Sequence, residues 1–149
     1  MTKTYRHETI INLPREAVFA VLTDIANWPK WDLDLVATEL DGAVLRAGSR
    51  FSITPKGTKA VAMTVEAIES PALFIDRATL PLGCIRGVHR LEAVPGGTRL
   101  IHEVSTSGAL AWLWDRIITR GIGAGLAEQA ARLAAYGIGI SSASKSGPP

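Results

Sequence analysis

Two histidines in the C-terminal half of the chain have the spacing of partners across a β-hairpin. If Val94 pairs with Gly97 across the turn residues Pro95-Gly96, then His89 lies opposite His102. Side chains that are directly opposite each other on two antiparallel strands lie on the same face of the sheet. Because imidazoles titrate near neutral pH, such a pair could hydrogen-bond a carbonyl or phenol group, or transfer a proton.

The same register pairs Leu91 with Leu100 on the face that carries the histidines. We therefore expect this face to be the inner one, with both imidazoles in or beside an apolar cavity. The alternative, which is the commoner situation for buried polar side chains, is that they only satisfy each other, a tryptophan N–H or a backbone group. A zinc site needs a third protein ligand, for which Glu66, Asp76 and His7 are candidates. No spacing favours any of these three, so we predict no metal and no cofactor.

Other residue types that often take part in chemistry have simpler interpretations here. The single cysteine, Cys84, excludes an internal disulfide and is interpreted as a small apolar core residue. Arg77, Arg86 and Arg90 are expected on solvated strand faces. The sequence GIGAG, residues 121–125, lacks the preceding strand that a dinucleotide-binding loop requires.

Composition restricts the class of protein. The 149 residues are 47% hydrophobic and 20% charged, which is typical of one globular domain. The 16 basic residues are scattered and the net charge is only +2, so we expect no nucleic-acid partner. We find no signal peptide and no 18-residue apolar run, and therefore predict a cytoplasmic protein with no membrane span. One domain is expected over residues 1–140, followed by a flexible tail over 141–149.

Hydrophobic periodicity predicts the order of the elements. An alternating first strand is expected over residues 4–13, followed by two short helices over 15–23 and 25–33. A long helix is expected from residue 109 to about 136, with bending or close packing at its glycines. Between the helices the period is two and turn residues recur, which predicts strands at 35–41, 43–46, 49–54, 59–69, 73–80, 84–94 and 98–108.

This order and three segments resemble the helix-grip superfamily, which includes polyketide cyclases/dehydrases, START-type lipid-transfer domains and the birch-pollen allergen. The segments are LPREAVFAVLTDIANWPKWD (residues 13–32), TVEAIESPALF (64–74) and GVHRLEAVPGGTRLIHEVSTSG (87–108), and the resemblance spans residues 5–136. It implies an α+β fold in which a curved antiparallel sheet of about seven strands wraps around a long C-terminal helix. Two short helices follow the first strand, and an apolar cavity lies between sheet and helix.

Three functions are compatible with this fold. The first is binding or carriage of an apolar small molecule, such as a lipid, aromatic or polyketide-like compound. The second is an enzyme of the cyclase/dehydrase type that uses His89 and His102 for acid–base chemistry. The third is a macromolecular interaction module, which requires an exposed apolar patch around Trp112 and Trp114. A homodimer through an edge strand or the long helix is possible.

The ligand-binding function leads to a specific set of expected cavity residues. They come from the tryptophan-containing segment, from inward positions of the strands and from the start of the long helix. The expected cavity residues are Trp28, Trp31, Phe51, Ile53, Met63, Val65, His89, Leu91, Leu100, His102, Leu113 and Ile117.

Overall fold

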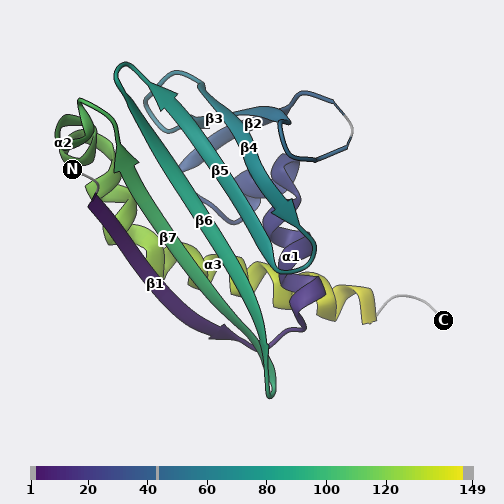
Figure 1. Cartoon of the computed structure of the whole chain (residues 1–149). Helices are drawn as coiled ribbons and strands as arrows, with labels where there is room; N and C mark the ends of the chain where they lie inside the picture. The colour runs from purple at the N-terminus through teal and green to yellow at the C-terminus, as the bar shows by residue number, and fades with distance from the viewer. Residues whose placement is uncertain (1–2, 43, 146–149) are drawn as a thin grey trace.

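The strands of the computed structural model, which describes residues 3–42 and 44–145, form a seven-stranded antiparallel sheet (Figure 1). Strands β2 to β7 follow one another as a meander, and β1 pairs with β7, so that β1 and β2 form the two edges. The strands are β1 (Lys3–Ile11), β2 (Leu35–Leu40), β3 (Arg50–Pro55), β4 (Val61–Glu69), β5 (Leu73–Leu80), β6 (Gly83–Val94) and β7 (Gly97–Ser107). The predicted helix-grip fold is confirmed.

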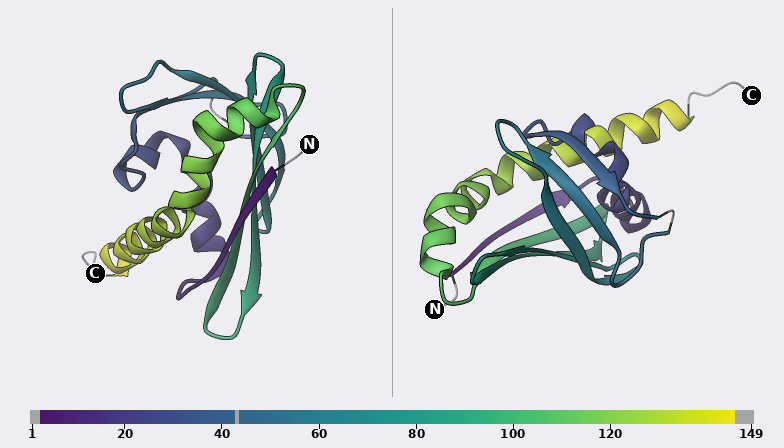
Figure 2. Two further views of the ribbon diagram at one scale, coloured as in Figure 1. Left: turned by 90° about the vertical axis from the view of Figure 1, so that its left-hand side faces the viewer. Right: turned by 90° about the horizontal axis from the view of Figure 1, so that it is seen from above.

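Two short helices follow the first strand, as predicted: α1 (Arg15–Thr23) and the 3₁₀ helix η1 (Ile25–Lys30). The C-terminal helical region comprises α2 (Ala111–Trp114), a π-helical turn η2 (Asp115–Thr119) and α3 (Arg120–Lys145). Figure 2 shows this helical region bending near its start and crossing the concave side of the sheet. None of the helices in the described part of the chain combines the length and hydropathy needed to cross a bilayer.

The glycines near the start of α3 allow close contact with the first strand. A Cβ at Gly123 would overlap the ring of Tyr5, so only glycine fits at this crossing. The Tyr5 hydroxyl also donates to Oδ1 of Asp115 over 2.9 Å, which connects β1 to the π-helical turn. Close packing therefore accounts for Gly123, whereas Gly125 faces open space.

The larger hydrophobic core lies between the inner face of the sheet and the helices. Phe74, Val65 and Leu100 from three strands pack in one cluster with Val18 of α1 and Leu133 of α3. All five are almost fully removed from solvent. Burial of each such side chain contributes roughly 1.5–3 kcal/mol, so this cluster provides much of the stability.

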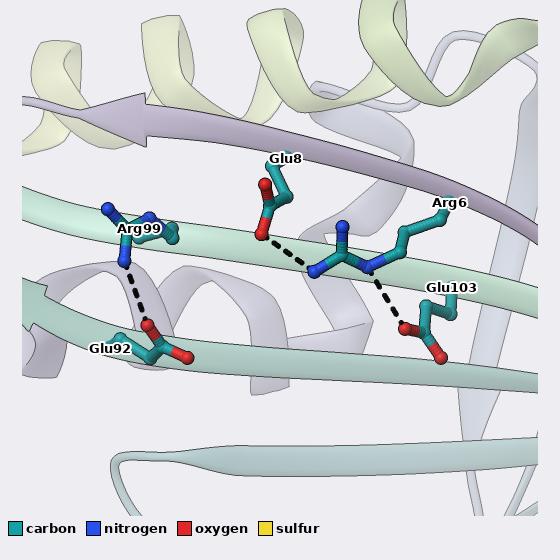
Figure 3. Close-up of polar contacts among 5 residues, drawn as sticks. All are labelled: Arg6, Glu8, Glu92, Arg99 and Glu103. Atoms are coloured by element: carbon teal, nitrogen blue, oxygen red, sulfur yellow. Dashed lines mark hydrogen bonds and ion pairs between the residues drawn. The ribbon is translucent and has the colours of Figure 1, made fainter.

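The outer face of the sheet carries ion pairs within β1 and between neighbouring strands (Figure 3). Arg6 contacts both Glu8, at 2.7 Å, and Glu103, at 3.2 Å, and Arg99 contacts Glu92 at 3.1 Å. In Figure 1 the helices lie behind this face of the sheet. The aliphatic parts of such charged side chains cover apolar surface, and Val88, Ile75 and Ile101 on this face are buried.

One predicted strand is not formed, and the long helix ends later than predicted. Residues 44–46 are not a strand, because hydrogen bonds from the Arg46 N–H to the Ser49 hydroxyl and from the Ser49 N–H to the Arg46 carbonyl close a local turn. Residue 43 lies outside the described residues. Helix α3 continues to Lys145, beyond the predicted end near residue 136, so that residues 141–145 of the expected tail are helical. Residues 146–149 lie outside the described part.

Candidate functional site

A cavity of about 260 Å³ lies between the inner face of the sheet, η1 and α3. Its wall is mostly apolar, with side chains from β3 to β7 on one side and Ile122, Ala130 and Leu133 of α3 on the other. Trp28 of η1 packs edge-on against Phe74, and its indole N–H donates to the Leu22 carbonyl over 2.9 Å. The hydrogen bond holds η1 to α1, and the ring packing holds it against the sheet.

The predicted cavity residues divide into three groups. Seven line the cavity: Trp28, Trp31, Ile53, Met63, His89, Leu100 and His102. Phe51, Val65 and Leu91 belong to the hydrophobic core cluster beside it. Leu113 and Ile117 contribute to neither, because Leu113 is half-buried and Ile117 is 61% exposed.

The position of Ile117 differs from the prediction because the chain forms a π-helical turn over Asp115–Thr119. The prediction assumed the α-helical period of 3.6 residues, and a wider turn changes which side chains face the sheet. Thr119 is fully buried instead and accepts a hydrogen bond from the Thr106 hydroxyl over 2.6 Å. The helical part of the cavity wall therefore begins one turn later, at Gly121 and Ile122.

The histidine register is confirmed: His89 lies opposite His102 on β6 and β7. Their rings stack with centroids 4.1 Å apart and planes inclined by 34°. His7 on β1 lies opposite His102 on its other side, so the three histidines of the chain form a row across three strands. Nδ1 of His89 lies 3.1 Å from the carbonyl oxygen of Phe74, which is the backbone contact expected for a buried polar side chain.

Both inner histidines are neutral at neutral pH. Burial lowers the pKa of His89 to about 4, and the hydrogen bond to the Phe74 carbonyl opposes this only in part. Burial, followed by the neighbouring His89 and His7, lowers the pKa of His102 well below its usual value. Because a carbonyl oxygen only accepts, Nδ1 of His89 must carry the proton, which makes Nε2 a hydrogen-bond acceptor.

Asp76, which the sequence offers only as a possible metal ligand, is a functional candidate. It lies on β5 opposite Gly87, lines the cavity and is 8% exposed. Burial raises the pKa of its carboxyl group to about 7, against the opposing effect of a hydrogen bond from its own backbone N–H. The available signal was an acidic residue at an inward strand position, two residues from both Phe74 and Ala78.

A second polar group lies where η1 meets α3. Gln129 donates to Oδ2 of Asp32 over 3.0 Å, and the backbone N–H of Asp34 donates to Oδ1 of Asp32 over 3.2 Å. Burial raises the pKa of Asp32, and the Gln129 hydrogen bond opposes that shift. The neighbouring Trp31 indole N–H is buried and has no hydrogen-bond partner among the described residues.

The remaining sequence candidates lie away from the cavity. Glu66 is on the outer face, where Arg86 contacts it at 2.5 Å, and within residues 3–42 and 44–145 no three His, Cys, Asp or Glu side chains are grouped to hold a metal ion. Burial raises the pKa of the Cys84 thiol, which disfavours the reactive thiolate. Trp112 is 66% exposed, whereas the Trp114 indole N–H donates to the Pro81 carbonyl over 2.8 Å.

The sequence profile of a family described as "Polyketide cyclase / dehydrase and lipid transport" matches residues 2–137. The chain belongs to this family. No curated protein matches the sequence closely enough to count as a relative.

Solved structures with the same fold are distant in sequence. Ara h 8.0201 has 14% identity and a TM-score of 0.71, with 93% of this chain and 99% of that chain covered. The di-domain ARO/CYC protein StfQ from the steffimycin biosynthetic pathway has 12% identity and a TM-score of 0.76, with 95% and 53% covered. A Thalictrum norcoclaurine synthase point mutant, in complex with a transition state analogue, has 12% identity and a TM-score of 0.72, with 95% and 97% covered. At such identities the similarity establishes the fold alone.

Proposed function

We propose that this protein binds an apolar small molecule in the cavity between the sheet and α3, with a polar group of that molecule directed at Asp76 and His89. The observation that carries the proposal is a mostly apolar cavity whose wall includes buried polar groups. Ligand sites of proteins commonly combine these two features. The family description, which includes lipid transport, supports the same class of function.

The size of the cavity narrows the ligand. Its volume of about 260 Å³ is close to the lower end of small-molecule sites, which range over roughly 300–1,000 Å³. A compound with two or three fused rings, or one short chain, suits this volume better than a complete phospholipid. The aromatic wall at Trp28 and Trp31 favours a flat ligand.

The polar groups on the wall support a bound molecule rather than an empty core. An unpaired buried donor such as the Trp31 N–H costs about 1–3 kcal/mol. The Asp76 carboxyl group accepts from its own backbone N–H and has no side-chain hydrogen-bond partner within residues 3–42 and 44–145.

The proposal is tested by denaturing extraction and mass spectrometry of the purified protein, with two leucine variants of α3. Gly125 lines the cavity and a Cβ there meets nothing within 4 Å, so Gly125→Leu adds a side chain at the cavity wall. Gly139 has equally open surroundings on the same helix but is exposed and does not line the cavity, so Gly139→Leu is the matched control.

We expect a small molecule to be recovered from the unaltered protein and from Gly139→Leu, and much less of it from Gly125→Leu. Equal recovery from all three proteins would mean that the molecule is bound elsewhere. Recovery of nothing from the unaltered protein, together with no binding of added apolar compounds, would refute the proposal.

A second candidate function is acid–base catalysis on the bound molecule, as expected for an enzyme of the cyclase/dehydrase type. It is favoured by a carboxyl group with a pKa of about 7 on the cavity wall, near neutral His89 and His102. One structural neighbour is by its title a norcoclaurine synthase. If the extracted molecule is added back, a chemical change whose rate depends on pH near 7 and is lost in Asp76→Asn would support catalysis. Recovery of unchanged molecule would leave binding as the function.

A further inference from the structure

Gly87 lines the cavity beside two polar groups of its wall, Asp76 and His89. A Cβ built at Gly87 would lie 2.6 Å from Oδ1 of Asp76 and 3.6 Å from Cε1 of His89. The backbone of Gly87 does not have a positive φ, so its conformation is open to other residues. Glycine is needed here because Oδ1 of Asp76 packs directly against it and leaves no room for a side chain. We call the part of the cavity that Asp76, Gly87 and His89 border the Gly87 gap.

The two polar groups that border the Gly87 gap have complementary hydrogen-bonding roles. His89 uses its Nδ1 proton for the Phe74 carbonyl, which makes Nε2 an acceptor. Asp76 in its protonated form has an O–H donor, and no side-chain partner for it occurs among the described residues. One donor and one acceptor therefore border the same space, within the cavity wall.

Building on the proposed function, we propose that the Gly87 gap binds a hydroxyl group, such as a phenol or an enol, on an otherwise apolar ligand. The hydroxyl oxygen accepts from Asp76, and the hydroxyl hydrogen is donated to Nε2 of His89. A ketone or ether oxygen would use only the Asp76 donor and leave His89 unpaired. A hydroxyl group uses both.

The preference for a hydroxyl group does not depend on one protonation state of Asp76. When Asp76 is ionised it is an acceptor only, and the ligand hydroxyl donates to the carboxylate. A methyl group of similar size satisfies neither Asp76 nor His89 in any state. Two ligands that differ only in hydroxyl against methyl therefore isolate the contribution of the Gly87 gap.

The test compares 2-naphthol with 2-methylnaphthalene, two flat two-ring probes of nearly equal size, by equilibrium dialysis below neutral pH. Two uncharged hydrogen bonds contribute enough for about tenfold tighter binding of 2-naphthol. Asp76→Val should abolish this preference while 2-methylnaphthalene still binds. Asp76→Asn, whose amide keeps a donor, should retain most of it. Glu103→Val, on the outer face of the sheet, is the control that loses a carboxylate without touching the cavity.

Gly87→Ala provides a second variant in case Asp76→Val does not fold. Its methyl group would lie against Asp76 Oδ1 and should reduce the preference for 2-naphthol. Equal affinity of the unaltered protein for both probes, or an undiminished preference in Asp76→Val or Gly87→Ala, would overturn the hydroxyl assignment and leave the proposed function intact. Failure of both probes to bind would count against the proposed function itself, and the hydroxyl assignment would fall with it.

Discussion

Replacement of Asp76 by asparagine should raise the free energy of unfolding at high pH and leave it nearly unchanged at low pH. Asp76 is 8% exposed, and burial raises the pKa of its carboxyl group from 3.8 to about 7. At about 1.4 kcal/mol per pKa unit, this difference corresponds to about 4 kcal/mol. Asparagine has the same shape and no charge, so it avoids this penalty at every pH.

The direction of this pH dependence follows from whether the folded or the unfolded chain holds the proton on Asp76. Below a pH of 3.8 the carboxyl group is protonated in both the folded and the unfolded chain, and the favourable contribution of the protonated group is complete. As the pH rises to about 7, the unfolded chain ionises while the folded chain keeps its proton, so the folded state is progressively destabilised. Above that pH the difference is constant. The unaltered protein should therefore lose stability over this range relative to Asp76→Asn.

Urea unfolding, followed by the fluorescence of the buried Trp28 and Trp31, measures the difference at several pH values. The other ionisable groups on the cavity wall are Asp32, Asp34, His89 and His102, and both proteins contain them. The comparison therefore isolates Asp76. A difference between the two proteins that does not change with pH would refute the reasoning, since it would mean that the folded-state pKa of Asp76 is ordinary.

A control variant, Glu103→Gln, removes a carboxylate from the outer face. Its loss of the ion pair with Arg6 should destabilise the protein by no more than about 1 kcal/mol, because both side chains are exposed. Asp76→Asn and Glu103→Gln should thus change stability in opposite directions at high pH. Two destabilised variants would mean that the Asp76 carboxylate makes favourable contacts that outweigh its burial.

Two further predictions concern neighbouring positions. Gly125→Ala should raise the free energy of unfolding, measured with urea, by up to about 1 kcal/mol, because alanine favours the helix and its methyl group meets open space. Gly123→Ala should lower the free energy of unfolding, because its methyl group would overlap the Tyr5 ring. Equal effects of the two substitutions would contradict the close packing of α3 against Tyr5. His89→Gln should reduce acid sensitivity: because the folded-state pKa is lowered from 6.5 to about 4, the stability that the neutral ring provides is complete above 6.5 and is lost as the pH falls toward 4. Over that range the unaltered protein should lose about 3 kcal/mol relative to His89→Gln, measured by urea unfolding, and parallel pH profiles would show that the ring is not buried in its neutral form.

Local patterns in the sequence were sufficient to predict the strands and helices and part of the candidate site. Alternating apolar residues and turn residues predict all seven strands, since a strand's exposure pattern depends on residues only two positions apart. The pairing of His89 with His102 could be predicted because a short turn at Pro95-Gly96 determines the register of the whole hairpin. The strand predicted over 43–46 is not present at residues 44–46, because hydrogen bonds between Arg46 and Ser49 form a turn that periodicity does not detect.

Only the tertiary structure decided which polar residues share the cavity. Asp76 and His89 belong to different strands, and the Gly87 gap between them depends on the pairing of β5 with β6. The raised pKa of Asp76 comes from burial in a cavity whose wall also includes residues of η1 and α3, which are distant from it in sequence. The π-helical turn that directs Ile117 to solvent also follows from packing against the sheet, through the contact of Thr119 with Thr106. The sequence by itself determined the strands, the helices and the histidine pair, because these depend on neighbouring residues. The cavity and its acid group depend on distances between elements, which only the folded chain specifies.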